Sequence, residues 1–186
     1  MRRRVVLALP LLAAAPARAA PLDDLMRGFA AVRTSRARFT EEKTMPELDL
    51  PLPSRGTLRW QAPDRLEKHT TEPVEEILRI EGETLTLERP ARGERQSLAL
   101  DRAPEIRPLV EALRATLAGD AATLRRHHEV TFFGNVAAWE MVLVPLSPRT
   151  RAVVQRVTLT GRNATVRVVE TQGSGGTSRM VIEPLP

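Results

Sequence analysis

The sequence predicts a mainly β protein of the α+β class, in which a single curved antiparallel sheet of about 11 strands forms an open half-barrel and two or three helices cover its concave apolar face. Apolar residues alternate along many short segments between Pro, Gly and acidic turns, whereas two other stretches repeat with helical spacing. So many strands in one small domain must form a sandwich or curl toward a barrel, and apolar helical faces need a surface to cover. A strongly curved sheet with helices on its concave side satisfies both requirements.

A first helix is expected directly after Pro21, where Asp23 and Asp24 suit the positive end of a helix. Apolar residues then recur with a period of about 3.6, which gives the helix one face to bury. This stripe consists of Leu22, Leu25, Met26, Phe29 and Val32.

A second helix is expected between Pro104 and Gly119, because proline favours the first turn of a helix and glycine the position just past the last turn. Asp120 can then cap a short third helix that extends through Arg126. The apolar stripe of the second helix consists of Ile106, Leu109, Val110, Leu113 and Leu117.

Strands are expected wherever the apolar period falls toward two. These segments are residues 37–39, 58–60, 66–68, 77–80, 85–87 and 98–100 in the first half, and residues 130–133, 139–144, 153–159, 165–169 and 178–182 in the second. Turn residues separate the later strands at residues 134–135, 161–163 and 173–176. The proline-rich link over residues 45–54 is expected to be an edge or a loop rather than a paired strand, because proline cannot donate to a sheet ladder.

Residues 1–19 have the three parts of a secretory signal peptide: three arginines, an apolar run and a small-residue end. We expect cleavage near Ala19, export from the cytoplasm and one domain over residues 20–186. The signal segment holds four of the 28 Lys and Arg residues and none of the 23 acidic residues, so the rest of the chain has a formal charge of only +1. This balance argues against nucleic acid as a partner, since phosphate binding needs clustered surplus cations.

The sequence shows no residue set typical of catalysis or metal binding. Cysteine is absent, and the adjacent His127 and His128 would point in different directions on a strand or a helix, which is poor geometry for a shared metal. No G-x-S-x-G elbow occurs, and Ser174 lies in a glycine turn. On a strand, Glu41 and Glu42 would point to opposite faces, so we expect a solvated pair rather than a catalytic dyad. The sequence therefore predicts a protein with no enzymatic activity, cofactor or metal.

Three motifs follow one another in the first half of the chain: Phe39-Thr-Glu-Glu-Lys43, Gly56-x-Leu58-x-Trp60-x-x-Pro63 and Ile80-x-Gly82-x-x-Leu85. Together with the helical segment at residues 104–117, their order and spacing resemble periplasmic lipoprotein carriers of the LolA type, and more closely the shorter LolA-like relatives. The resemblance covers nearly the whole chain after residue 19. It implies an open β-barrel with a helical lid, formed here by residues 104–117, over a cavity for lipid acyl chains.

The resemblance also implies a function and partners. Members of the family ferry lipoproteins between the inner and outer membranes of Gram-negative bacteria, which implies a monomeric periplasmic carrier for the acyl chains of a lipoprotein or lipid. An inner-membrane transporter would supply the cargo and an outer-membrane acceptor would receive it.

Family carriers have a lid-holding arginine before the proline of the second strand, where this chain has Ala62. The candidate cavity residues are Phe39, Leu58, Trp60, Leu66, Leu109, Leu113 and Trp139.

Other interpretations of the same residues stay open. The apolar strand residues also fit a filled core, and a protein of this fold could be a non-transporting sensor of envelope lipids or a scaffold. A lipid esterase is the enzymatic alternative. Bound lipid in the purified protein would favour the carrier over the scaffold.

Overall fold

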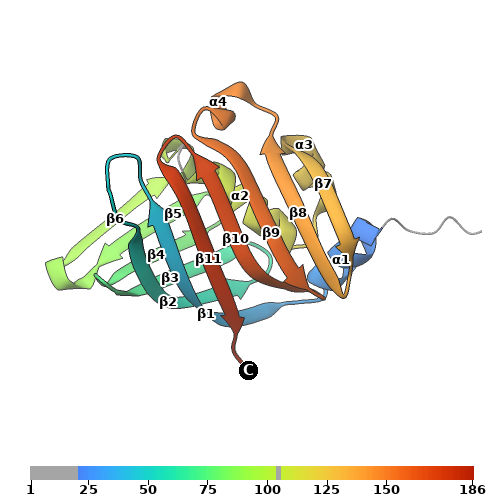
Figure 1. Cartoon of the computed structure of the whole chain (residues 1–186). Coiled ribbons are helices and arrows are strands. Elements are labelled where there is room, and N and C mark those ends of the chain that lie inside the picture. The colour runs from blue at the N-terminus through green and yellow to red at the C-terminus, as the bar shows by residue number, and fades with distance from the viewer. Residues whose placement is uncertain (1–20, 104–105) are drawn as a thin grey trace, which may run out of the picture.

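The computed structural model describes residues 21–103 and 106–186, and its strands form one antiparallel sheet of 11 strands (Figure 1). The order across the sheet is β6-β5-β4-β3-β2-β1-β11-β10-β9-β8-β7. The strands are β1 (Thr34–Thr44), β2 (Leu52–Gln61), β3 (Arg65–Glu72), β4 (Glu76–Glu81), β5 (Thr84–Arg89), β6 (Glu94–Ala99), β7 (His128–Asn135), β8 (Ala138–Pro145), β9 (Val154–Arg162), β10 (Thr165–Gly173) and β11 (Gly176–Pro184). The predicted signal peptide and Pro104 lie outside the described residues.

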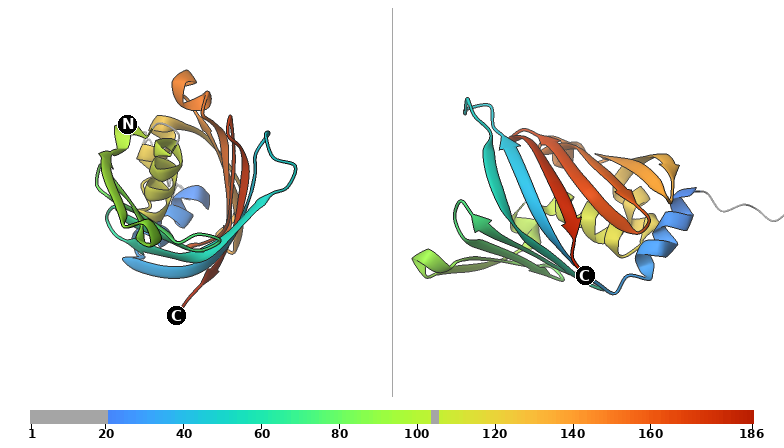
Figure 2. Two further views of the ribbon diagram at one scale, coloured as in Figure 1. Left: turned by 90° about the vertical axis from the view of Figure 1, so that its left-hand side faces the viewer. Right: turned by 60° about the horizontal axis from the view of Figure 1, so that its bottom comes forward.

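Two meanders make up the sheet, and the antiparallel pairing of β1 with β11 joins them. β1 to β6 run outward to one edge, and β7 to β11 return from the other edge to the middle. Figure 2 shows the sheet end-on as a curved trough that does not close, with β6 and β7 as its edges. The predicted half-barrel is therefore confirmed.

Helices cover the concave side of this trough (Figure 2). The connection from β6 to β7 supplies α2 (Arg107–Leu117) and α3 (Ala121–His127), and α1 (Pro21–Ala30) packs beside both. The expected apolar residues of α1 are buried except Val32, which lies beyond the end of the helix at Ala30. A further short helix, α4 (Pro148–Arg151), connects β8 to β9.

The core consists of two apolar clusters, and α2 contributes to both. The larger cluster lies between the helices and the β7–β10 half of the sheet, where α2 adds Ala112 and Ala115. The smaller cluster lies against β4 and β5, where α2 adds Val110. The buried members of the smaller cluster are Ile80, Leu85, Leu100, Ala103 and Val110.

Some boundaries predicted from the sequence were wrong. Residues 52–54 belong to β2 and pair with β1, although they were assigned to the proline-rich link. Pro53 is accommodated because β3 pairs with β2 only from Arg55 onward, so this end of β2 has a free edge. Leu100 lies in a 3₁₀ turn, because β6 already ends at Ala99.

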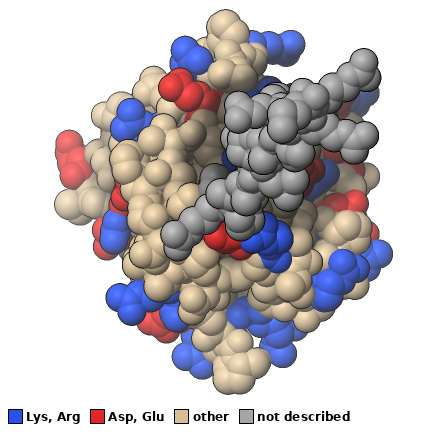
Figure 3. All heavy atoms as spheres, turned by 90° about the vertical axis from the view of Figure 1, so that its right-hand side faces the viewer, with Lys and Arg blue, Asp and Glu red and all other residues tan. Residues whose placement is uncertain are grey.

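Charged side chains of both signs alternate over the outer surface. Figure 3 shows Lys and Arg interspersed with Asp and Glu on the face it displays. On the convex face of the sheet, Arg79 lies 2.8 Å from Glu67 and 2.7 Å from Glu88. Such exposed pairs add little to stability but keep the surface solvated. No helix among the described residues is long and apolar enough to cross a bilayer.

Gly119 ends α2 at a point where the chain touches α1. Its φ is +70°, and its N–H donates to the carbonyl of Thr116 at 3.0 Å, as is common for a left-handed glycine just past the C-terminus of a helix. A Cβ at this position would lie 2.3 Å from the carbonyl oxygen of Met26. The turn therefore needs glycine both for its left-handed conformation and for the space it leaves to α1.

We predict that Gly119→Ala lowers the free energy of unfolding by more than about 2 kcal/mol, because left-handed strain of about 1 kcal/mol adds to the clash with α1. Gly93→Ala is the matched control: Gly93 has a φ of +63°, but a Cβ there would meet nothing within 4 Å. It should lose only about 1 kcal/mol. Denaturant unfolding of both variants measures the difference, and equal losses would contradict the close contact.

Candidate functional site

Four of the predicted cavity residues share the concave face of β1, β2 and β3. The strand register places Leu58 opposite Ala37 and Leu66 opposite Trp60. Because side chains two positions apart point to the same face, Phe39 lies on this side as well. This face turns toward the helices, and Phe39 and Trp60 are buried on it.

The other three candidates lie in the opposite half of the trough. Trp139 on β8 is part of the larger apolar cluster, and Leu109 and Leu113 on α2 pack against that cluster. The structure therefore places all the candidates on the inner side, but in two groups that belong to different halves of the sheet.

The aromatic candidates are closed off from solvent. Phe39 is 2% exposed, Trp60 3% and Trp139 4%. The four candidate leucines keep intermediate exposure. The leucines are therefore the more accessible members of this set, and the three aromatic rings are its buried members. A role in ligand binding stays a prediction for all of these residues.

Hydrogen bonds hold both tryptophans in place. Trp139 Nε1 donates to the carbonyl of Asn163 at 2.8 Å, and the ring of Phe29 meets Trp139 edge-on at 5.8 Å between centroids. Trp60 Nε1 donates to the carbonyl of Val32 at 3.4 Å. These contacts fix the positions of the two tryptophan rings in the wall.

Two arginines tie the lid helix α2 to the turn between β4 and β5. Arg114 Nη1 donates to the carbonyl of Gly82 at 2.6 Å and lies 3.7 Å from a Glu83 carboxylate oxygen. Arg107 lies 3.7 Å from the other oxygen of the same carboxylate. Ala62 can form no such ion pair, and the arginines that connect α2 to the sheet in this chain lie on the helix itself. Sequence reasoning missed them, although their spacing of two helical turns places both on one helix face.

We predict that Arg114→Met loosens α2, because the variant keeps an apolar stem but loses the hydrogen bond to Gly82. Amide hydrogen exchange within α2 should become faster on the order of tenfold, as the loss of one charge-assisted hydrogen bond implies. Arg79→Met removes comparable pairs from the convex face and should leave exchange in α2 unchanged. Unaltered protection of α2 in Arg114→Met would mean that this arginine does not hold the lid.

A charged pair lies on the concave face beside Phe39. Lys68 Nζ on β3 donates to Glu41 on β1 and stands 4.9 Å from the centre of the Phe39 ring. Ser178 on β11 donates to the second Glu41 oxygen at 2.5 Å, and Ser54 on β2 to the first at 3.4 Å. The expectation of a solvated Glu41 was wrong, because four strands converge on this carboxylate and leave it 16% exposed.

The environment of Glu41 lowers its pKa. Burial raises the pKa, but attraction to Lys68 and the hydrogen bonds from Lys68, Ser178 and Ser54 outweigh burial and hold the pKa below the ordinary 4.5. The unfolded chain therefore takes up this proton at a higher pH than the folded protein. The stability that the ionised Glu41 contributes is present above pH 4.5 and is lost as the pH falls through the folded pKa.

We predict that the stability difference between the wild type and Glu41→Gln is constant above pH 4.5 and shrinks as the pH falls below that value. Denaturant unfolding over a pH series measures it. Glu42→Gln, at the exposed neighbour on the other face of β1, is the control and should change stability little at any pH. A difference for Glu41→Gln that does not vary with pH would contradict the buried ion pair.

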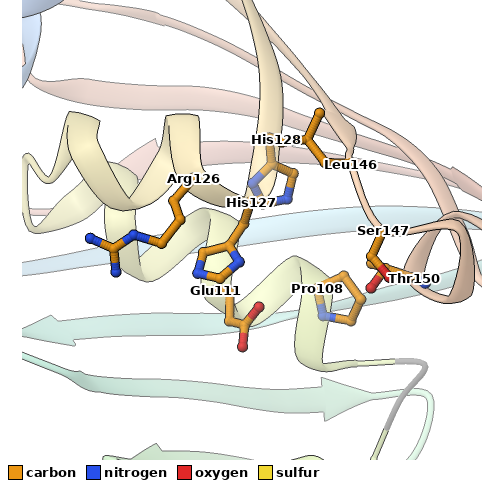
Figure 4. A pocket seen from close by; sticks show the side chains of 8 residues that line it. All are labelled: Pro108, Glu111, Arg126, His127, His128, Leu146, Ser147 and Thr150. Atoms are coloured by element: carbon orange, nitrogen blue, oxygen red, sulfur yellow. Dashed lines mark hydrogen bonds between the residues drawn. The ribbon is translucent and has the colours of Figure 1, made fainter.

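A separate polar pocket of about 120 Å³ lies where α2, α3 and β7 meet the β8–α4 connection (Figure 4). His128 is 4% exposed, and its Nδ1 has no hydrogen-bond partner among the described residues. Burial lowers the pKa of His128 and keeps the ring neutral near pH 7. Within residues 21–103 and 106–186, no three His, Cys, Asp or Glu side chains are arranged to hold a metal ion. The pocket is lined by Pro108, Glu111, Arg126, His127, His128, Leu146, Ser147 and Thr150.

These features define a class of protein: an antiparallel half-barrel whose apolar concave face is covered by a lid helix. The sequence profile of one family, described as "Outer membrane lipoprotein carrier protein LolA-like", matches residues 14–182. The chain therefore belongs to the LolA-like family, and the resemblance seen in its strand motifs is confirmed.

The chain is also similar to individual proteins in sequence or in structure. An outer-membrane lipoprotein carrier protein of Methylibium petroleiphilum is 34% identical over 117 residues, which cover 62% of this chain and 53% of that protein. The chain thus spans about half the length of this curated relative. A LolA superfamily protein from Nitrosomonas europaea is 10% identical with a TM-score of 0.44, over 89% of this chain and 92% of that one. LprF from Mycobacterium bovis is 9% identical with a TM-score of 0.40, over 88% and 90% of the two chains.

Proposed function

We propose that this protein binds the acyl chains of a lipoprotein, or of another lipid, on its concave face and carries them between the inner and outer membranes. The observation behind the proposal is the apolar inner surface, where α2 covers both clusters of the core. Membership of the LolA-like family supports the same role, and the name of the Methylibium relative supports lipoprotein as the cargo. Carriage requires only binding and release, so the proposal contains no catalytic step.

Burial of acyl chains supplies enough free energy for such a carrier. At about 0.8 kcal/mol per methylene, a chain of about fourteen methylenes gains on the order of 11 kcal/mol, before the costs of ordering the chain and moving the lid. The closed form already buries Phe39, Trp60 and Trp139, so the cargo must displace packed groups in order to enter. That cost weakens retention, which suits a protein that has to release what it carries.

The proposal includes a location and partners. Residues 1–19 would act as a signal peptide, and residues 20–186 would work in the periplasm as a monomer. A cycle between two membranes needs a donor and an acceptor, and we propose an inner-membrane transporter and an outer-membrane acceptor for these roles.

Native mass spectrometry with lipid extraction tests the proposal, on the full chain expressed in a bacterial host and purified from its periplasm. A bound acylated molecule at defined stoichiometry supports the carrier and identifies the cargo class. A ligand-free mass, together with no uptake of fluorescent acyl probes, would contradict it. That result would favour a non-transporting scaffold with a filled core. The deep burial of the three aromatic candidates is also compatible with this interpretation.

We predict that Leu58→Gln weakens binding of a fluorescent acyl probe on the order of tenfold, because it places an unpaired amide against the bound chain. Arg59→Gln is the matched control, since the next residue of β2 points to the convex face and should leave affinity within about twofold. Fluorescence titration gives both dissociation constants. Equal effects of the two variants would show that the concave face is not where the probe binds.

A further inference from the structure

In the part of the sheet ordered β6-β5-β4-β3-β2-β1-β11, the concave face changes from apolar to polar along each strand. Because neighbouring strands run in opposite directions, the register brings all the polar positions toward the same end of the trough. We call this set the polar belt. On each strand, the last apolar inward residue is followed by the first polar one. These pairs are Leu98 and Gln96 on β6, Leu87 and Arg89 on β5, Leu78 and Glu76 on β4, Leu66 and Lys68 on β3, Leu58 and Ser54 on β2 with Gly56 between them, Phe39 and Glu41 on β1, and Met180 and Ser178 on β11.

Lys68 stands at the boundary between the two regions. It lies directly across from Leu58 in the ladder, and its ammonium group sits over the Phe39 ring. An ammonium group has three N–H donors, and among the described residues one of them goes to Glu41. The Lys68 side chain lies on the concave side of β3 and is 29% exposed, so it is not sealed off from a ligand on that side.

The charges around Lys68 do not favour an anion. Glu41 neutralises the ammonium group directly. Farther along the belt, Arg89 is shared between two carboxylates, those of Glu76 at 3.1 Å and Glu94 at 3.4 Å. A bound carboxylate would therefore meet three carboxylates and two cations among these residues, whereas a neutral oxygen needs only a spare donor of Lys68.

We propose that Lys68 and Glu41 form the subsite for the polar end of the cargo and select a neutral carbonyl oxygen, as in an ester- or amide-linked acyl chain, over the carboxylate of a free fatty acid. This inference rests on the proposed carrier function. The carbonyl oxygen accepts a hydrogen bond from Lys68, and the acyl chain runs from there over Phe39 and Leu58 into the apolar region. Glu41 holds the ammonium group in position and repels a competing carboxylate.

Competition between palmitate and its glycerol monoester tests this subsite. Both carry the same chain and are added below their micelle concentrations at a pH of about 7.5, where the free acid is ionised. Displacement of a fluorescent acyl probe from the full-length protein measures the two affinities. The wild type should prefer the monoester on the order of tenfold, as expected for one charge-assisted hydrogen bond against an opposed charge.

Two variants should move this preference in opposite directions. Glu41→Gln leaves the Lys68 charge uncompensated and should shift the preference toward palmitate. Lys68→Gln leaves Glu41 uncompensated and should weaken palmitate further. Arg79→Gln breaks an ion pair on the convex face and should leave the ratio of affinities unchanged. The wild-type ratio and Lys68→Gln keep the test decisive if Glu41→Gln does not fold.

The possible failures are distinguishable. Binding of both ligands with equal affinity, or a ratio that none of the variants moves, would overturn the subsite while the carrier function stands. Absence of any acyl binding by the wild type would overturn both. A preference for palmitate in the wild type would mean that Lys68 acts as an unopposed cation and would overturn the proposed role of Glu41.

Discussion

The apolar inner face of the sheet has to be removed from water, and most of the fold follows from the way α2 achieves this. The helix presents Ala112 and Ala115 to one half of the trough and Val110 to the other, so a single element stabilises both clusters. Small side chains on α2 allow it to approach the larger cluster closely. Gly119 then lets the chain turn away without colliding with α1. Without α2, the curved sheet would expose the surface that drives its folding.

The lid is held by two kinds of interaction with different consequences. Its apolar contacts are strong and extend over both clusters, whereas Arg107 and Arg114 attach it at the rim through half-exposed polar contacts. Water can replace the rim contacts at small net cost, because a polar group loses little when it exchanges one hydrogen-bond partner for another. Most of the cost of opening therefore lies in the apolar surface that opening exposes, and an acyl chain is chemically suited to cover that surface.

The periodicity of apolar residues along the chain predicted which side chains share one face of a strand or helix. Alternation along β2 gave the shared face of Leu58 and Trp60, and the stripe of α1 gave its buried residues. The pair Glu41–Lys68 was missed because its members lie on strands separated by β2, and alternation says nothing about which strands meet. The contact from Arg114 to Gly82 was missed for the same reason. Pro53 was misjudged because its tolerance depends on where β3 stops pairing.

The two edges of the sheet belong to strands that do not pair with each other: in the described part of the chain, β6 and β7 end the sheet at opposite sides. β6 carries charged residues along an exposed edge, which discourages pairing with another chain. If β6 and β7 moved apart, no hydrogen bond between strands would break. In a closed barrel, the same widening would break the hydrogen bonds between two paired strands. In the proposed carrier, the room for acyl chains would be set by how far α2 lets these two edges move apart, so one fold could hold cargo with different numbers of chains.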